Sequence, residues 1–312
     1  MPAFSAYSDL IFLRTESTFS SKSIQNARKM REKQEIQETL MKLTFLGTGA
    51  AEAQPAFFCT CDVCRRAREN GGKDIRKRCC YLLDGDTLID YGPDIYAQTL
   101  MYGIDLAQIR RIIFTHSHED HLDPVELLWR RPGFSKVGSD LDIYGGRAVH
   151  ARIKSILSYE QCRLAEHEVN PGDEFKAGDL EVLALRGNHD AKADPLNYII
   201  TRGGKTILIA NDTGWWSDEN WALAAKYGRK LDLAVIESTG AMIPGRWYGG
   251  HLTGEETVAF REKLLELGLI GPETRCITNH FSHNASPIQE DLEKFFLPHG
   301  IEPAYDGMTV EV

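Results

Sequence analysis

Residues 116–121, HSHEDH, place three histidines and two acidic residues on one short stretch after the apolar run Arg111–Phe114. In an extended loop, residues i and i+2 face the same way. We therefore expect His116 and His118 to point together, while Asp120 and His121 reach a neighbouring point. Imidazole nitrogens and carboxylate oxygens suit Zn²⁺, Mn²⁺ or Fe²⁺. This loop can surround more than one cation.

Single candidate ligands recur after three other apolar runs: His189 after Leu180–Leu185, Asp212 after Thr206–Ala210, and His280 after Arg275–Thr278. Asp90, at the end of the run Thr87–Asp90, is a candidate carboxylate for contacting a metal ligand and fixing its orientation without touching the metal. Functional side chains are commonly carried by loops at the ends of rigid strands. One lone histidine is usually a satisfied core residue, but this ordered set predicts a metal centre.

Three cysteines, Cys59, Cys61 and Cys64, form a second cluster. Thiolates at these spacings can close on one Zn²⁺ and leave a fourth position, which His283 could fill, three residues after His280. Such a closed site is structural and would pin a long loop beside the histidines. The alternative is three free thiols.

Composition limits the classes of protein that this chain can belong to. It has 312 residues, of which 42% are hydrophobic, enough for a large core. No apolar run reaches the roughly 18 residues of a membrane span, so no membrane partner is expected. Lys+Arg number 36 against 45 Asp+Glu, a net charge of -9, and nucleic-acid binding is therefore not expected. No signal peptide is visible, which predicts a cytoplasmic protein with reduced cysteines.

Short apolar runs alternate with helical patterns from residue 42 onward, which predicts one layered α/β domain over residues 42–312. Predicted strands are Leu43–Leu46, Thr87–Asp90, Arg111–Phe114, Leu141–Tyr144, Leu180–Leu185, Thr206–Ala210, Leu231–Ile236 and Arg275–Thr278. Predicted helices are Asp94–Tyr102, Asp123–Trp129, Arg147–Tyr159, Ser217–Tyr227, Thr253–Leu267 and Pro287–Phe296. Ser217 and Thr253 are predicted N-caps, with Glu256 completing a capping box.

Residues 1–41 differ from the rest in being rich in Ser and charge. We interpret them as a flexible N-terminal extension. Their acidic residues disfavour a transit peptide. A natural start at Met41 is the remaining alternative.

The full set of histidines and aspartates resembles the metallo-β-lactamase superfamily, whose signature is a His-x-His-x-Asp-His loop followed by His, Asp and His on later strand-end loops. The resemblance covers residues 42–312 and implies an αββα sandwich of two mixed sheets with outer helices. It also implies two divalent ions. One would be held by His116, His118 and His189, the other by Asp120, His121 and His280, with Asp212 bridging and Asp90 orienting a ligand.

The cysteine cluster narrows this resemblance. With the Gly47–Gly49 turn, the basic run Arg76–Arg78 and the pair His280 and His283, the chain resembles the cyclic phosphodiesterases of the carbon–phosphorus lyase pathway, which open a 1,2-cyclic phosphate on 5-phosphoribose. Cofactor-biosynthesis proteins of the pyrroloquinoline quinone protein B type share a similar cysteine cluster and are an alternative. The tRNA 3′-processing endonucleases share only the metal loops. A non-catalytic metal-binding scaffold is the least favoured interpretation.

The resemblance implies a metal-dependent phosphodiesterase acting on a small, cyclic phosphate ester. A hydroxide bridging the two metals would attack phosphorus. Asp120 and His251 are the predicted catalytic residues, His251 as the proton donor to the leaving alkoxide. The alternative for His251 is a loop histidine or a phosphate-binding group. The active-site metals could be Zn, Mn or Fe, beside one structural Zn, and the resemblance suggests a homodimer.

Two further features bear on substrate recognition. Arg76, Lys77 and Arg78 form either a solvated charged turn or a contact to a second phosphate. Trp215, Trp216 and Trp247 either wall the pocket or pack in the core.

Overall fold

The computed structural model describes residues 40–245, 249–285 and 288–312. The predicted extension, residues 1–41, lies outside the described residues except for its last two. Contacts between residues group Leu40–Val312 into one unit.

Seven strands form the first sheet in the order β14-β1-β2-β3-β4-β5-β6. Their bounds are β1 Lys42–Gly47, β2 Cys80–Leu83, β3 Thr87–Ile89, β4 Arg111–Ile113, β5 Leu141–Gly145, β6 Leu164–Glu168 and β14 Thr309–Glu311. Pairing is antiparallel from β14 to β3 and parallel from β3 to β6. The carboxyl ends of β3 and β4 therefore lie side by side at one edge.

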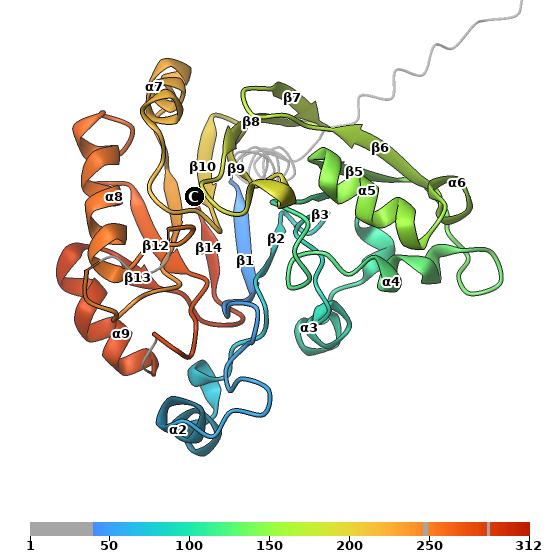
Figure 1. The fold of residues 1–312 in the computed structure, drawn as a ribbon. Coiled ribbons are helices and arrows are strands. Elements are labelled where there is room, and N and C mark those ends of the chain that lie inside the picture. The colour runs from blue at the N-terminus through green and yellow to red at the C-terminus, as the bar shows by residue number, and fades with distance from the viewer. Residues whose placement is uncertain (1–39, 246–248, 286–287) are drawn as a thin grey trace, which may run out of the picture. The chain divides into compact units, whose positions relative to one another are not determined.

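The second sheet also has seven strands, in the order β13-β12-β11-β10-β9-β8-β7. Their bounds are β7 Glu174–Ala177, β8 Leu180–Arg186, β9 Leu196–Arg202, β10 Lys205–Ala210, β11 Leu233–Glu237, β12 Arg275–Asn279 and β13 Glu302–Pro303. The strands β10 to β13 pair in parallel, and the antiparallel β9 makes β8 run the same way as β10. The carboxyl ends of β8, β10, β11 and β12 thus share one edge (Figure 1).

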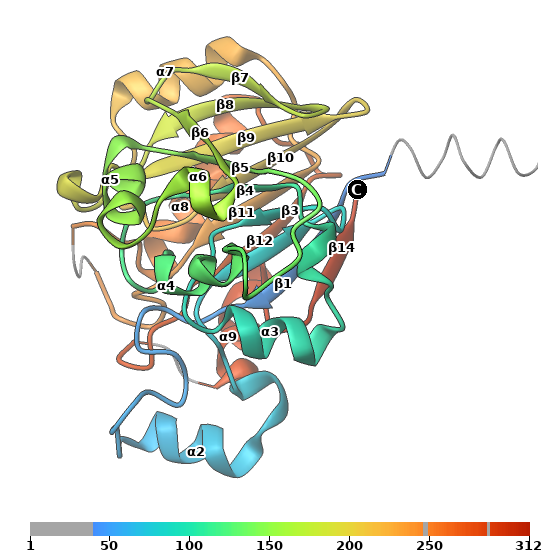
Figure 2. The ribbon, with the colours of Figure 1, turned by 90° about the vertical axis from the view of Figure 1, so that its right-hand side faces the viewer.

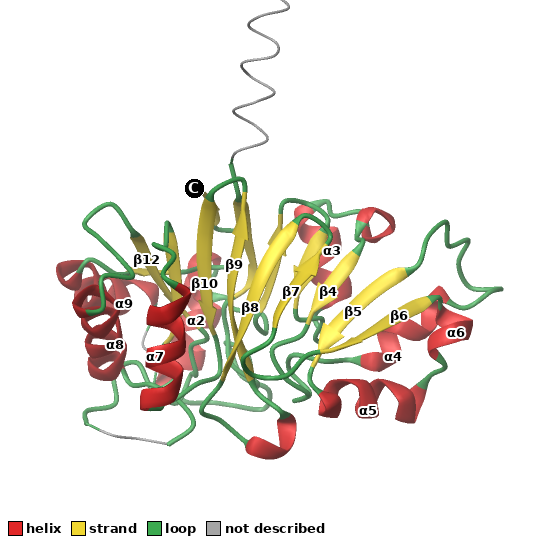
Figure 3. Ribbon diagram, turned by 90° about the horizontal axis from the view of Figure 1, so that it is seen from above, coloured by secondary structure: helices red, strands yellow, loops and turns green. Residues whose placement is uncertain are grey.

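Helices cover the outer face of each sheet (Figures 2 and 3). The first sheet carries α3 Ile95–Tyr102, α4 Pro124–Leu127, α5 Arg147–Ile156 and α6 Tyr159–Cys162, and the second carries α7 Asp218–Tyr227, α8 Gly254–Glu266 and α9 Gln289–Phe296. One apolar cluster fills the space between the two sheets. A second lies between the first sheet and its helices, and a third between the second sheet and its helices. These three cores confirm the four-layer αββα sandwich.

Local sequence signals set several helix ends. Thr253 and Glu256 form the predicted capping box at the start of α8, and the Ser217 hydroxyl caps α7. The predicted helix Arg147–Tyr159 is wrong as one element. Leu157 is extended, and Ser158 caps a separate short helix, so the chain turns between α5 and α6.

Several elements escaped prediction. They are the helix α2, Asp62–Asn70, and the strands β2, β6, β7, β9, β13 and β14. The predicted helix Pro287–Phe296 begins at Gln289, and Pro287 lies outside the described residues. Among the described helices, none has both the length and the apolarity that crossing a membrane requires.

Candidate metal centre

The predicted ligands converge at the edge where the parallel strands of both sheets end. Residues 116–121 follow β4, His189 follows β8, Asp212 follows β10 and His280 follows β12. Because parallel strands share one carboxyl edge, side chains far apart in the sequence meet there. The structure brings together all seven residues that the sequence singled out.

Three histidines form the first group of candidate ligand atoms. His118 Nδ1 lies 3.0 Å from His116 Nε2 and 3.1 Å from His189 Nε2. The three nitrogens all lie within 4.8 Å of one another. Three imidazole nitrogens in this arrangement can hold one divalent ion.

Asp120, His121 and His280 form the second group. His121 Nε2 lies 3.1 Å from Asp120 Oδ2 and 3.2 Å from His280 Nε2. All three residues are buried. This set can hold a second ion.

Asp212 stands between the two groups. Its Oδ2 lies 3.1 Å from His121 Nε2 and 3.2 Å from His280 Nε2, and its carboxylate also groups with His189. No described residue donates a well-aligned hydrogen bond to this buried oxygen, although the His121 ring, whose pKa is raised, lies 3.1 Å from it. A buried carboxylate oxygen without a hydrogen bond is costly unless a cation meets it. The position therefore fits a ligand shared by two ions.

Each candidate histidine turns one ring nitrogen inward and has the other held by the protein. The outer nitrogens meet Thr115 Oγ1 (His116, 3.0 Å), Asp190 Oδ2 (His118, 3.5 Å), Asp90 Oδ2 (His121, 2.7 Å), Gly250 O (His189, 3.0 Å) and Thr239 Oγ1 (His280, 2.8 Å). Such partners fix the ring orientation of metal-binding histidines. This pattern fits a metal centre better than a histidine core.

The electrostatics of the centre also favour cations. Burial alone would lower the pKa of His121, but Asp120, Asp212 and Asp90 raise it well above its ordinary value. Burial holds the pKa of His116 well below its ordinary value, so this imidazole is neutral at pH 7 with a lone pair available. The carboxylates thus attract positive charge at the centre, while His116 offers nitrogen rather than charge.

Three of the strand-end residues adopt left-handed backbone conformations, with φ of 65° at Asp90, 44° at Asp212 and 62° at His280. Such conformations cost about 1–3 kcal/mol each and persist where the surroundings determine them. Asp90 is held by the Thr115 backbone N–H, 2.7 Å from its Oδ1. The unusual backbone aims each side chain back across the sheet edge.

Sequence reasoning missed a buried carboxylate, Glu237, at the end of β11. Its Oε1 accepts hydrogen bonds from Thr213 N and from His251 Nδ1, each at 2.8 Å. Its Oε2 accepts from the backbone and hydroxyl of Thr239, whose hydroxyl also contacts His280. Glu237 follows an apolar run, the same signal that identified Asp212, and that signal could have found it.

Glu237 sets the chemistry of His251. Burial alone would lower the pKa of His251, but the Glu237 carboxylate outweighs it and raises the pKa to about 9. The imidazole is therefore protonated near pH 7. Its ring centroid lies 4.7 Å from that of His189, so the charged ring lies beside the first group of ligands.

A pocket of about 300 Å³ opens onto the centre. Its walls include Glu52, Asp120, Asp212, His251, His280 and Ser282. A larger cavity of about 390 Å³ lies under α3 and α4, but none of the candidate metal ligands lines it. The chemistry therefore belongs to the smaller pocket, which the candidate ligands line.

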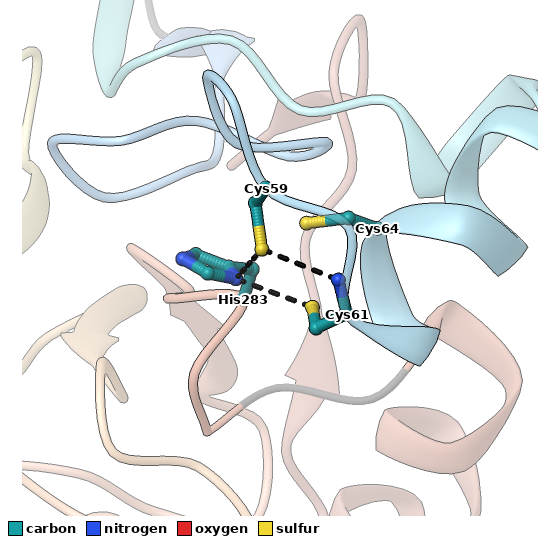
Figure 4. A group of neighbouring side chains, drawn as sticks. All are labelled: Cys59, Cys61, Cys64 and His283. Carbon is teal, nitrogen blue, oxygen red and sulfur yellow. Dashed lines mark hydrogen bonds between the residues drawn. The ribbon is translucent and has the colours of Figure 1, made fainter.

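Figure 4 shows the cysteine cluster with His283. His283 Nδ1 lies 3.5 Å from the Sγ atoms of both Cys59 and Cys61, and the four candidate ligand atoms lie within 4.8 Å of one another. Cys64 sits in the first turn of α2, buried, where burial raises its thiol pKa to about 12. The Cys61 backbone N–H instead lowers the pKa of Cys59. The arrangement can hold one zinc with four ligands.

The prediction of a solvated turn at Arg76–Arg78 is wrong. The Arg76 side chain is only 1% exposed, and all three cations are occupied by protein groups. Arg76 donates to Thr48 Oγ1 and Ala304 O, each at 2.8 Å, Lys77 Nζ lies 3.1 Å from Asp306, and Arg78 lies 2.9 Å from Asp94. The run holds loops together.

Two of the three tryptophans singled out from the sequence pack in or against the core. Trp216 is buried in the core between the second sheet and its helices, and Trp215 packs against that core. Trp247 lies outside the described residues.

Comparison with known proteins gives the family. The beta-lactamase superfamily domain matches residues 86–267, more than half of the chain. The chain belongs to this superfamily.

Ribonuclease Z from Thermosynechococcus vestitus is 31% identical over 122 residues, 38% of this chain and 30% of that protein. Ribonuclease Z from a Picosynechococcus strain is 28% identical over 194 residues, 60% of this chain and 52% of that protein. The chain thus spans about a third to a half of the curated relatives that it matches.

Solved structures of the same fold cover nearly the whole described chain. A diphosphatase from the PhnP family has a TM-score of 0.68 at 23% identity, over 87% of this chain and 98% of that one. Zinc-bound PqqB from Methylobacterium extorquens has a TM-score of 0.68 at 17% identity, over 87% of this chain and 100% of that one. At these identities the likeness supports the metallo-β-lactamase fold.

Proposed function

We propose that this chain is a metal-dependent phosphodiesterase that hydrolyses a small, cyclic phosphate diester. The observation that carries the proposal is the position of Asp212, a buried carboxylate shared by two sets of nitrogen and oxygen ligands. Family membership and the ribonuclease Z and PhnP-family relatives agree with hydrolysis at phosphorus. A pocket of about 300 Å³ suits a small ester rather than a polymer.

The proposed ligand sets follow the two groups of atoms. His116, His118 and His189 would hold one ion, Asp120, His121 and His280 the other, and Asp212 would touch both. Two divalent ions, when bound, supply an activated water and positive charge opposite the phosphoryl oxygens. Asp90 keeps His121 in the orientation that this requires. Zn, Mn and Fe all suit these ligands.

His251 is the proposed proton donor to the leaving alkoxide. It lines the pocket, and Glu237 both orients the ring through Nδ1 and keeps it protonated. The opposite nitrogen, Nε2, is then the one that can give its proton to the departing oxygen. Glu237 acts through His251 and is a positioning residue.

The cluster of Cys59, Cys61, Cys64 and His283 is the proposed structural zinc site. It would fix the loop before α2 next to the loop after β12, which also carries His280. A closed set of four ligands leaves no position for substrate. Its contribution to activity is therefore the shape of the pocket wall.

Turnover of bis-p-nitrophenyl phosphate tests the proposed class against a thioester and a β-lactam. The proposal predicts hydrolysis of the phosphate diester by the metal-loaded protein and at most weak hydrolysis of the other two. Preference for the thioester or the lactam would contradict it. Complete inactivity with all metals bound would favour a metal-binding scaffold.

Two relatives define the alternatives. The similarity to PqqB keeps a cofactor-biosynthesis enzyme as the second candidate. PqqB has the same fold, and its TM-score of 0.68 equals that of the PhnP-family diphosphatase. The ribonuclease Z relatives make precursor tRNA a necessary fourth substrate in the comparison. Cleavage of precursor tRNA with a higher kcat/KM than any small diester would replace the proposal by an RNA-processing role.

A further inference from the structure

We propose that Glu52 is a specificity-determining residue that binds a hydroxyl group of the substrate and disfavours a second phosphate at that side of the pocket. The inference rests on the proposed phosphodiesterase function and names its substrate class. That class is a phosphate diester whose alcohol part carries a free hydroxyl, as a sugar does, and no further phosphate.

Glu52 lies in the loop after β1 and lines the same pocket as His251 and His280. Three carboxylates line this pocket among the described residues, and Asp120 and Asp212 belong to the proposed ligand sets. Glu52 belongs to neither set. Its carboxylate therefore faces the pocket without a proposed metal partner.

The surroundings of Glu52 hold its carboxylate in one orientation. Oε1 accepts hydrogen bonds from the Ser282 hydroxyl and from Asn284 Nδ2, the latter at 3.2 Å, and His283 Nε2 lies 3.6 Å away. Within the described part of the chain, every hydrogen bond and ion pair of this carboxylate uses Oε1. The side chain is 30% exposed, so Oε2 remains accessible to a donor in the pocket.

The chemistry of this wall selects the ligand group. An ionised carboxylate only accepts hydrogen bonds, so its partner must donate one. Ser282 and Asn284 also line the pocket and are neutral groups that can both donate and accept. This combination matches the hydroxyls of a polyol.

At the Glu52 side of the pocket a second phosphate would find no described lysine or arginine, and the charged His251 is assigned to the leaving oxygen. Among the described residues that line the pocket, none is Lys or Arg. The nearby basic run is engaged with its own partners, including Asp306 and Asp94. Like charges placed opposite each other without a cation are strongly disfavoured. Glu52 would repel such a substrate.

His283 links Glu52 to the cysteine cluster. Its Nδ1 faces Cys59 and Cys61, while its Nε2 faces Glu52. A carboxylate behind a metal-binding histidine is a common arrangement that fixes both groups. The proposed zinc site therefore also helps to aim the specificity residue.

The test compares Glu52→Ala and Glu52→Gln with wild type on three diesters: adenosine 2′,3′-cyclic phosphate with a free 5′-hydroxyl, its 5′-phosphorylated counterpart, and bis-p-nitrophenyl phosphate. Glu69→Gln, an equal loss of charge at an exposed position on α2, is the matched control. Wild type should prefer the free hydroxyl over the 5′-phosphate. Both Glu52 variants should lower that ratio of kcat/KM at least about tenfold, and the Glu69 variant should not.

The Gln variant separates hydrogen bonding from charge. It should keep more activity on the hydroxyl substrate than the Ala variant, because the amide still accepts a hydrogen bond. Equal losses on all three diesters would reduce Glu52 to a structural role and overturn the proposal. Preference of wild type for the 5′-phosphorylated substrate would also overturn it.

If no diester is hydrolysed, ligand binding tests the proposed hydroxyl site at Glu52. Calorimetry with metal-loaded protein compares adenosine 2′-phosphate with adenosine 2′,5′-bisphosphate. A preference for the monophosphate that Glu52→Gln abolishes would support the hydroxyl site while the phosphodiesterase proposal fails. Equal affinities in wild type would reject the hydroxyl site.

Discussion

The histidine centre and the cysteine cluster are both groups of ligand atoms brought together by distant loops, but they differ in exposure and in supporting partners. The histidine centre is open to a pocket, and each of its five histidines has an outer nitrogen held by the protein. The cysteine cluster is a set of four ligand atoms beside a short helix. An open, oriented site suits chemistry, whereas a closed one suits fixing a loop.

The two regions also differ in how they carry charge. The histidine centre contains three carboxylates, Asp90, Asp120 and Asp212, that surround His121 and draw in positive charge before any metal binds. The cysteine cluster includes the thiol of Cys64, whose pKa of about 12 keeps it protonated near pH 7 before metal binds. Metal binding must therefore displace a proton from His121 in the first region and from Cys64 in the second, and the first region offers buried carboxylates that attract the cation.

Asp212→Asn should have the largest effect. The change removes the charge shared by the two groups, so kcat/KM should fall by at least about 10³-fold, more than the 10–100-fold cost of losing a ligand-orienting neighbour. Metal analysis should show loss from the histidine centre with the zinc of the cysteine cluster retained. Asp218→Asn, at an exposed position on α7, is the control. Full activity of the Asp212 variant would contradict the shared-ligand assignment.

His251→Ala should come next, with a loss in kcat of about 10²–10⁴-fold, as expected for removal of a proton donor. Both active-site metals should remain bound, because His251 is outside the proposed ligand sets. Elemental analysis beside kinetics checks this, and the exposed His299→Ala is the control. Loss of metal from the His251 variant would show that the proposed role is wrong.

Cys64→Ala should affect stability more than chemistry. The variant should bind one zinc fewer per chain and melt at a lower temperature, because a structural zinc contributes folding energy. Activity on bis-p-nitrophenyl phosphate should fall less than in the Asp212 and His251 variants. Cys162→Ala removes another buried thiol, far from the cluster in the core of the first sheet, and should keep all zinc. Unchanged zinc content in the Cys64 variant would rule out the proposed structural zinc site.

Lowering the pH should have the smallest effect of these changes, and it should act on the zinc affinity of the cysteine cluster. Because burial raises the pKa of the Cys64 thiol to about 12, the thiol is protonated near pH 7 and zinc binding must displace its proton. The apparent zinc affinity of the cluster should therefore fall by about tenfold per pH unit for this ligand as the pH is lowered. His116, whose pKa burial holds well below its ordinary value, adds little proton competition at the other site, where His121 is the ligand that must release a proton. Chelator competition between pH 8 and pH 6 measures the zinc affinity of the cluster, and a pH-independent affinity would contradict the prediction.

Much of the site could be predicted because its ligands follow apolar strands in a fixed order. His189, Asp212 and His280 each lie within three residues of the end of such a strand, and the second sheet brings those strand ends to one edge. The pattern of strands and helices predicted a layered α/β domain, and the resemblance to the superfamily implied its four layers. The strand β9, which pairs with β10, was missed although Gly203 and Gly204 separate the two runs as a two-residue turn typical of a hairpin.

Other features depend on contacts that spacing does not reveal. Arg76 is buried in a network with Thr48 and Ala304, although a run of three basic residues usually lies on the surface. Asn211 and Asn279, one residue before Asp212 and His280, both hydrogen-bond to Cys79 Sγ between the sheets, at 2.9 and 3.1 Å. Such pairs join strands that are far apart in the sequence, and only the fold brings them together.

Anomalous diffraction from crystals of the reconstituted protein tests the central claim most directly. The account predicts two peaks about 3.5–4 Å apart on either side of Asp212, and a third peak among Cys59, Cys61, Cys64 and His283 at the zinc edge. A single peak, or none, among the histidines after full reconstitution would contradict the paired-metal centre.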